Sequence, residues 1–521
     1  MKRRAPRKAV GAAVAGAAVT VMAATLLAAC GFSATPVTVP ATFDKPLPIP
    51  PLAESRIAED GTRVFQLTVQ AGSREFIAGT PTETWGYNGD YLGPTLRAAR
   101  GERVAVEFTN SLPEATTVHW HGMHLPAAMD GNPHQLVEPG GTWRPTWTID
   151  QPAATLWYHP HPHGETEQHV YRGLAGMFLL DDEDSRMPGL PAEYGVDDIP
   201  VVVQDKHIGS DGELLLDNDG NEIGLLGSTI LVNGATGPYQ EVTTESVRLR
   251  LLNGSTARTY NFGFADDRAF QLVATDGGFL EAPYETTRVR LSPGERAEIV
   301  VRMQPGTATR LRSYPPDLGG VVAPFAFGGN DSFDVLELRA AKNLKPVGEL
   351  PDRLRADVER PDPAAASTAR SFELQDREIN GRRMDMDRID ETVQVGTTEI
   401  WQVTNRNPFP HNFHIHDVQF RVKSIDGAPP PPELRGPKDT IFLEPRRRYE
   451  LVMRFEDYTD DSVPYMYHCH LLLHEDDGMM GQFLVTDGPA SRPGRVAPPG
   501  DHDQGHHDQG HHDHSDHGHG H

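Results

Sequence analysis

The amino-acid sequence predicts an all-β protein built from several β-sandwich domains. Glycine and proline are numerous, with 50 and 44 residues respectively. Short runs of alternating side chains recur between turn residues, for example at positions 63–69 and 248–252, as in antiparallel strands. The chain of 521 residues is too long for one ordinary core and is long enough for about three domains.

The charge of the chain excludes one large class of partners. Its formal net charge at pH 7 is −25, so we expect no nucleic-acid partner and no binding to an anionic membrane surface. An acidic surface can instead concentrate cations.

The first 30 residues are typical of an export signal. A basic start is followed by an apolar stretch at 10–29, and Leu27-Ala28-Ala29-Cys30 resembles a bacterial lipobox. We therefore expect 1–30 to be a lipoprotein-type signal segment, with the exported chain anchored by lipid at Cys30 to the outer face of the cytoplasmic membrane or to the cell envelope. Ordinary cleavage after small residues and an uncleaved anchor are the alternatives. Residues 31–54 contain six prolines, which predicts a stiff tether.

Apart from Cys30, the one cysteine is Cys469, which stands between His468 and His470. His474 follows five residues after it and Met479 ten residues after it. Thiolate, imidazole and thioether are soft ligands of the kind that copper prefers in proteins. If 465–471 is a strand, Cys469 faces one side and the two flanking histidines face the other. One strand could then serve two metal sites.

Histidines recur at two-residue spacing, which places them on one face of a strand. Five such pairs occur before the tail: 119/121, 159/161, 161/163, 414/416 and 468/470. Random placement at this composition would give about 0.45 pairs. A zinc site also uses such pairs, but one zinc needs only three or four ligands. The excess favours copper at two linked centres.

Five features together resemble the multicopper oxidases. They are His119-Trp-His121-Gly, Trp157-Tyr-His159-Pro-His161, His411-Asn-Phe-His414-Ile-His416, His468-Cys469-His470 and Met479. Further similarity lies at 92–96, 230–234, 271–277 and 291–296, and the resemblance covers most of 55–487.

The resemblance implies four copper ions with a defined set of ligands. The type 1 copper would take His411, Cys469, His474 and, axially, Met479. The type 2 copper would take His119 and His414. The type 3 pair would take His121, His159, His161, His416, His468 and His470. We expect no ligand role for His163, His124, His134, His169 or His207.

Two acidic residues also match the family pattern. Asp130 lies nine residues after His121, and Glu475 directly follows His474. Family members use carboxylates at these places to deliver protons, and oxygen reduction consumes four protons. The alternative is that both carboxylates only orient ligand histidines.

The family architecture is three consecutive cupredoxin-like Greek-key β-sandwich domains. We expect domain 1 at 55–185, domain 2 at 186–345, a linker at 346–367 and domain 3 at 368–487. Domain 2 has no ligand motif and is expected to be a spacer. Residues 488–521 are predicted to be a disordered tail rich in His and Asp. This tail could gather extra metal, or it could be solvated and bind metal incidentally.

The resemblance implies one-electron oxidation of a reductant at the type 1 copper and reduction of O2 to water at a trinuclear cluster. We favour a laccase-like enzyme with small organic donors, because no methionine-rich insert is evident. Cuprous ion is the alternative donor. A non-enzymatic scaffold, such as the cell-division member of this fold, would be expected to lack the ligands. A copper carrier would not need a thiolate between paired histidines, and copper nitrite reductases lack the four-motif set.

Overall fold

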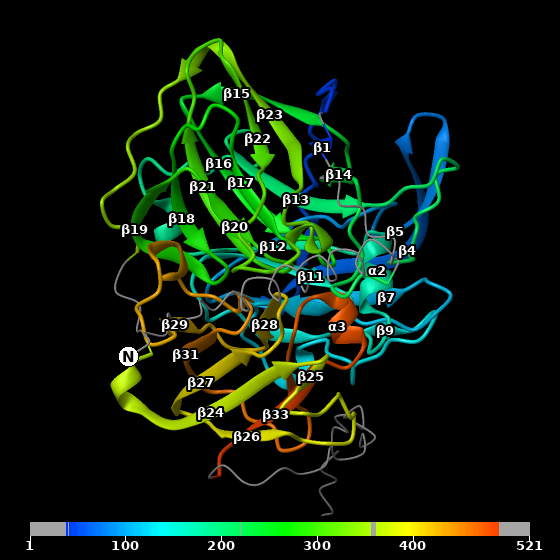
Figure 1. Cartoon of the computed structure of the whole chain (residues 1–521), viewed down its shortest axis with the longest axis vertical. Coiled ribbons are helices and arrows are strands. Elements are labelled where there is room, and N and C mark those ends of the chain that lie inside the picture. Colours follow the sequence, from blue (N-terminus) through cyan, green and yellow to red (C-terminus); the bar gives the residue numbers. More distant parts are fainter. Residues whose placement is uncertain (1–37, 40, 219, 356–360, 489–521) are drawn as a thin grey trace, which may run out of the picture.

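The computed structural model describes residues 38–39, 41–218, 220–355 and 361–488. These residues form six β-sheets with little helix, so the predicted all-β fold class is confirmed. The sheets are arranged as three two-layered sandwiches (Figure 1). The predicted signal segment 1–30 and all of the predicted tail after residue 488 lie outside the described residues.

The first sandwich packs a six-stranded sheet on a four-stranded sheet. The six strands are β3 (Ser55–Ile57), β4 (Arg63–Ile77), β5 (Thr80–Tyr87), β7 (Arg103–Asn110), β9 (Thr142–Trp143) and β10 (Thr146–Thr148). The four strands are β6 (Leu96–Ala99), β8 (His119–His121), β11 (Ala154–His159) and β12 (Gly176–Asp181).

The middle sandwich packs a seven-stranded sheet on a six-stranded sheet. The seven strands are β1 (Thr38–Val39), β2 (Lys45–Pro46), β15 (Pro238–Thr244), β17 (Tyr260–Phe264), β20 (Val289–Leu291), β22 (Ala308–Ser313) and β23 (Ser332–Lys345). The six strands are β13 (Asp198–Lys206), β14 (Thr229–Val232), β16 (Ser246–Asn253), β18 (Phe270–Thr275), β19 (Gly278–Thr286) and β21 (Arg296–Arg302).

The third sandwich packs two five-stranded sheets on each other. One contains β24 (Ala366–Gln375), β25 (Glu378–Ile379), β27 (Thr398–Asn405), β29 (Arg421–Ile425) and β31 (Arg448–Arg454). The other contains β26 (Glu391–Gln394), β28 (His411–Ile415), β30 (Thr440–Leu443), β32 (Tyr465–His468) and β33 (Met480–Thr486).

Helices are short and lie in the connections. The described residues contain α2 (Thr166–Arg172) and α3 (Leu472–Asp476), which contact each other. Short 3-10 turns occur at Ala127–Met129, Asp184–Arg186, Pro324–Phe327, Pro363–Ala365 and Pro432–Leu434. Within the described residues, no helix is long and apolar enough to cross a membrane.

Strand alternation decides what each sandwich encloses. In β28, Phe413 and Ile415 belong to the buried core of the third sandwich. Because successive side chains alternate faces, His414 points to the opposite side. In β8, Trp120 lies in the core of the first sandwich, so the histidines on either side of it also point outward. The histidine pairs therefore occupy the outer faces of two sheets that meet between sandwiches.

Part of the range predicted as a tether is folded onto the middle sandwich. β1 pairs with β23 and β2 pairs with β15. Phe43 and Leu47 are buried, because their apolar side chains complete the edge of that sandwich. Residues 41–54 therefore belong to the folded body.

The strand predicted at 465–471 is shorter than expected. β32 ends at His468, and Cys469 and His470 continue as chain without ladder pairing. The alternation of faces survives because Tyr465, Tyr467 and Cys469 all lie in the core of the third sandwich.

Candidate copper centres

Three residues of the third sandwich form the first candidate centre, which we call the sulfur group. Its members are His411, Cys469 and His474. The Cys469 Sγ atom lies 3.5 Å from Nδ1 of each imidazole, and the two Nδ1 atoms lie 3.1 Å apart. All three side chains are fully buried. One sulfur and two ring nitrogens therefore converge on a single point.

Each imidazole of the sulfur group makes a hydrogen bond through Nε2, the ring nitrogen that does not face the sulfur. His411 Nε2 donates to Asn407 Oδ1 at 3.0 Å, and His474 Nε2 donates to the backbone oxygen of Glu222 at 2.7 Å. With the proton on Nε2, the Nδ1 lone pair is free to face the sulfur. Met479 is fully buried in the same core as Cys469, and its backbone oxygen accepts from the Cys469 amide.

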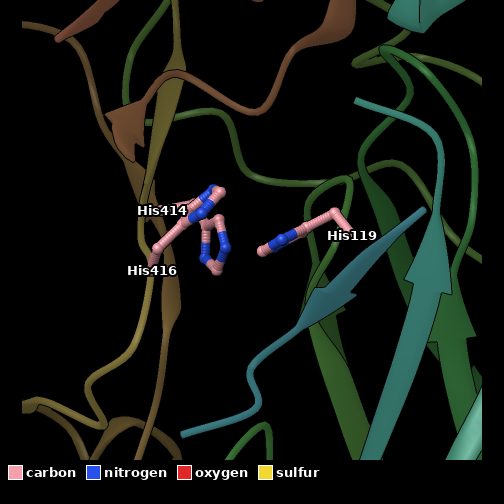
Figure 2. A group of neighbouring side chains, drawn as sticks. All are labelled: His119, His414 and His416. Atoms are coloured by element: carbon pink, nitrogen blue, oxygen red, sulfur yellow. The ribbon is translucent and has the colours of Figure 1, made fainter. Parts of the chain in front are cut away.

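Eight further histidines form the second candidate centre, which we call the histidine cluster. They come from the first and third sandwiches: His119, His121, His159, His161, His414, His416, His468 and His470. Ladder pairing aligns them, since His119 stands opposite His159 and His414 opposite His468. Figure 2 shows the His119 side chain on β8 pointing toward His414 and His416, which lie on the facing segment of the third sandwich. Every ring is buried.

The ring nitrogens divide the histidine cluster into two triads and one pair. In one triad, His161 Nε2 and His416 Nε2 lie 3.2 and 3.3 Å from His468 Nε2. In the other triad, His159 Nε2 lies 3.3 Å from His121 Nδ1 and 3.4 Å from His470 Nε2.

The pair consists of His119 and His414, whose ring centroids are 5.9 Å apart. His119 stacks on His416, and His414 stacks on His121, with centroid separations of 3.9 and 3.7 Å. The pair therefore lies against one ring of each triad.

Carboxylates lie behind the cluster rings. Asp130 Oδ2 lies 2.7 Å from His416 Nδ1, and Asp130 Oδ1 lies 3.3 Å from His119 Nδ1. Glu475 lies 3.2 Å from His161 Nδ1 and 3.0 Å from His468 Nδ1. Both acids therefore contact the side of a ring that faces away from the cluster interior.

Burial favours the neutral form of six of the eight cluster imidazoles. Removal from water, reinforced by neighbouring rings, holds the pKa of His121, His159, His161 and His414 well below its ordinary value. Burial likewise lowers the pKa of His416 and His470 to about 3. Neutral imidazole is the form that binds a metal.

The two acids behave as ionised acceptors. Burial alone would raise the pKa of Asp130 and Glu475, but contact with the histidine rings lowers it overall. A carboxylate that accepts from a ring nitrogen fixes the tautomer and orientation of that ring.

The residues present fit copper. Among the described residues, neither His119 Nε2 nor His414 Nε2 has a hydrogen-bond partner, although both atoms are buried. A buried polar atom without a partner is costly, and a metal ion would satisfy it. Burial raises the pKa of the Cys469 thiol to about 12, so a bound metal would have to displace the thiol proton.

The middle sandwich is more than a spacer, and that expectation was wrong. Glu222 caps His474 through its backbone oxygen, and a Cβ placed on Gly294 would lie 3.2 Å from His121 and His470. Arg296 makes a fully buried ion pair with Asp439, which contacts His121. Neither Arg296 nor Asp439 was predicted as a site residue, although Arg296 stands in the matched 291–296 motif.

The remaining histidines have other contacts. His124 bridges Asp417 and Asp457, His134 contacts Gln482, and His169 contacts Thr116 and Glu114. His163 and His207 are exposed. None of these five lies in a buried group of convergent metal-ligand atoms within the described residues.

Comparison with known proteins identifies the family. Models described as multicopper oxidase match residues 68–185, 210–310 and 357–489. A multicopper oxidase of Staphylococcus haemolyticus is 36% identical, over 84% of this chain and 92% of that protein. The cell division protein FtsP of Escherichia coli is 38% identical, over 85% of this chain and 93% of that protein.

Solved structures agree. A laccase-like multi-copper oxidase, CueO, of the lignin-degrading bacterium Ochrobactrum sp. is 37% identical, with a TM-score of 0.77 over 85% of this chain and all of that one. A multicopper oxidase of Campylobacter jejuni, described as a metallo-oxidase, is 27% identical, with a TM-score of 0.74 over 86% of this chain and 96% of that one.

The chain belongs to the multicopper oxidase family, and its sandwiches have the cupredoxin fold. It is an oxidoreductase that uses O2 as acceptor. Family membership implies bound copper and a reducing substrate.

Proposed function

We propose that the protein is a laccase-like oxidase with four copper ions. The sulfur group with Met479 would hold the type 1 copper, and the His119/His414 pair would hold the type 2 copper. The two triads would hold the type 3 pair: His161, His416 and His468 around one ion, and His121, His159 and His470 around the other. Copper bound in these places would accept electrons singly from a donor and pass four of them to O2.

One observation carries this proposal. Cys469 lies in the sulfur group, His468 lies in one triad and His470 lies in the other, so three consecutive residues reach three different metal positions. A copper carrier has no need of a covalent connection between two kinds of centre. An oxidase needs it, because electrons that enter at one centre are consumed at the other.

Asp130 and Glu475 would serve the same reaction as proton carriers as well as orienting groups. Each contacts an outward ring nitrogen of two ligands. Reduction of O2 takes up four protons, and a carboxylate this close can hand a proton inward. Replacing either by its amide should slow oxygen reduction more than electron uptake at the sulfur group, measured by rapid mixing.

The surroundings of the sulfur group favour an organic donor. Phe409 packs 5.2 Å from the His411 ring and 6.2 Å from the His474 ring. Phe327 of the middle sandwich stacks on Phe409 at 5.9 Å. Val322, five residues before Phe327 in the chain, is 90% exposed. Aromatic side chains next to the electron entry site suit aromatic donors. The similar Ochrobactrum enzyme acts on lignin model compounds.

Cuprous ion is the second candidate donor. The amide of Met384 donates to the backbone oxygen of Gly478, the neighbour of Met479, at 2.8 Å. Met384 and Met386 are half-buried, and Asp385 and Asp387 are exposed. Thioether and carboxylate close to the sulfur group could receive copper ions. The similar Campylobacter protein is described as a metallo-oxidase.

Oxygen uptake by the copper-loaded protein tests both candidates. A blue thiolate band with uptake on a phenolic donor supports the laccase-like assignment, and uptake on cuprous ion alone supports the second candidate. Met384→Leu combined with Met386→Leu should leave phenol oxidation unchanged, with Leu216→Met as a surface control. Absence of the blue band, or of uptake with either donor, would overturn the proposal.

Localisation and the tail remain part of the proposal. The basic start and apolar stretch before Cys30 support export with lipid attachment. Labelled fatty acid should enter the wild-type protein and not Cys30→Ser. Deleting 501–521 should lower copper loading at limiting copper if the histidines of the tail gather metal, and unchanged loading would contradict that role.

A further inference from the structure

Arg296 of the middle sandwich joins all three sandwiches in one buried site. Its guanidinium donates twice to Asp439 of the third sandwich, each time at 2.7 Å. Its Nε atom donates at 2.8 Å to the backbone oxygen of Thr155, in β11 of the first sandwich. Contacts to the backbone oxygens of Gly294 and Asp276 use the remaining donor capacity. Arg296 and Asp439 are both fully buried.

Asp439, held in place by Arg296, in turn contacts two histidines of the cluster, His121 and His414. Its Oδ1 atom accepts from His121 Nε2 at 3.0 Å, and its backbone oxygen accepts from His414 Nδ1 at 2.9 Å. The hydroxyl of Thr440 lies 3.0 and 3.1 Å from the same two ring nitrogens. The two rings stack with an interplanar angle of 9°.

These contacts set which nitrogen of each ring is free. With Nε2 of His121 donating to Asp439, its Nδ1 lone pair faces the triad. With Nδ1 of His414 donating to the Asp439 backbone, its Nε2 lone pair faces His119 across the pair. One acidic residue thus fixes one ring of a triad and one ring of the pair.

Asp439 needs a counter-charge to occupy this position. A carboxylate without solvent is strongly unfavourable unless it is paired, and Arg296 supplies the pairing from another sandwich. The adjacent Lys438 is also neutralised from the middle sandwich, at 2.8 Å from Asp276 and 3.1 Å from Glu295. The charges of Lys438 and Asp439 in the third sandwich are therefore both neutralised by residues of the middle sandwich.

Two glycines show how closely this ion pair approaches the cluster. Gly122 has a φ of +83°, and a Cβ there would lie 2.4 Å from Asp439 Oδ2 and 2.7 Å from Arg296 Nη2. The glycine that ends the His119-Trp-His121-Gly motif therefore leaves room for the ion pair. A Cβ on Gly294, whose backbone oxygen accepts from Arg296, would lie 3.2 Å from both His121 and His470.

We propose that Arg296 is a positioning residue for the histidine cluster, which acts through Asp439 to hold His121 and His414 in their metal-binding orientations. This inference rests on the proposed assignment of copper to the cluster. Arg296 contacts neither the sulfur group nor the rings themselves, so its removal should affect one centre selectively.

The test compares Arg296→Lys and Asp439→Asn with Arg250→Lys. Lysine keeps the charge but cannot make the paired contact, and asparagine keeps the size without the charge. Arg250 makes a similar buried double contact with Asp198 and also reaches Thr155, but it touches no ligand histidine. The measurements are the blue absorption, the electron paramagnetic resonance signal of type 2 copper, copper affinity against a chelator, and thermal unfolding.

Arg296→Lys and Asp439→Asn should keep the blue absorption, change the type 2 signal and weaken copper binding at the cluster by about 10–100-fold. Arg250→Lys should keep both spectra. A wild-type type 2 signal and affinity in Arg296→Lys or in Asp439→Asn, or equal loss of both centres in all three variants, would overturn the inference. A wild-type protein that is blue but binds no further copper would instead overturn the proposed function.

Discussion

The sulfur group and the histidine cluster are built in opposite ways. The ligands of the sulfur group come from one sandwich, with His411 and His474 separated by 63 positions. The cluster takes ligands from two sandwiches, and His121 meets Asp439 across 318 positions. The first centre therefore takes all its ligands from one domain and receives one backbone contact, that of Glu222 to His474, from the middle sandwich. The second centre depends on how three domains dock.

The groups behind the ligands differ as well. The sulfur group rests on neutral oxygens, those of the Asn407 amide and the Glu222 backbone. The cluster rests on the carboxylates of Asp130, Glu475 and Asp439. Several cations in one buried volume need negative charge nearby, whereas one cation beside a thiolate already has it. The outer contacts thus match the charge that each centre would hold.

Removal of the thiolate should have the largest effect, and it should affect only the sulfur group of the two centres. Cys469→Ser should abolish the blue absorption and lower donor oxidation to the level of a buffer control, because a hydroxyl cannot replace the soft ligand. The type 2 resonance signal should remain, since the cluster does not use the sulfur. Loss of the type 2 signal together with the blue band would contradict the independence of the two centres.

The next largest effect should come from a side chain that collides with the Arg296–Asp439 ion pair. Gly122→Ala should lower copper affinity at the cluster and oxygen reduction by about 10–100-fold, while the blue band persists. Gly101→Ala is the matched control, because Gly101 has a φ of +87° but no atom within 4 Å of its added Cβ. Equal effects of the two substitutions would assign the loss to backbone strain alone.

Acid should lower the free energy of unfolding of the metal-free protein. The histidine cluster should contribute more to this loss than the sulfur group. Burial lowers the pKa of His416 and His470 to about 3 and that of His474 to about 4. These folded-state values lie below the unfolded value, so the unfolded chain binds more protons as pH falls from about 6.5.

Each of these histidines should then reduce the free energy of unfolding by up to about 1.4 kcal/mol per pH unit between about pH 6.5 and its folded pKa. Denaturant unfolding of chelator-treated protein at pH 7, 6 and 5 measures the slope. A free energy of unfolding that stays constant between pH 7 and pH 5 would contradict the prediction.

The smallest expected effect is on donor binding near the sulfur group, with no effect on the histidine cluster. Phe327→Ala should raise KM for a phenolic donor by about fivefold, the equivalent of about 1 kcal/mol of lost apolar contact. The type 2 signal should not change. Val322→Ala, in the same segment, should leave KM unchanged, and a similar rise there would argue against a specific aromatic contact.

Much of the ligand set could be predicted from sequence because its cause is local. The two-residue spacing of His119/His121, His414/His416 and His468/His470 places both members of each pair on one face of a chain, and Cys469 between the last two faces the other way. Trp120 and Phe413 pack into the sandwich cores, which fixes those faces. The copper assignments and the domain boundaries remain predictions.

The sequence by itself determined the fold class, the types of ligand and the face of the strand from which each would project. Only the tertiary structure decided which rings group together and what holds them. Alternation along a strand is a property of neighbouring residues. Arg296, Asp439 and Glu222 acquire their roles only when three sandwiches dock and exclude water, because buried charges and ring nitrogens must then find partners wherever the chain has placed them.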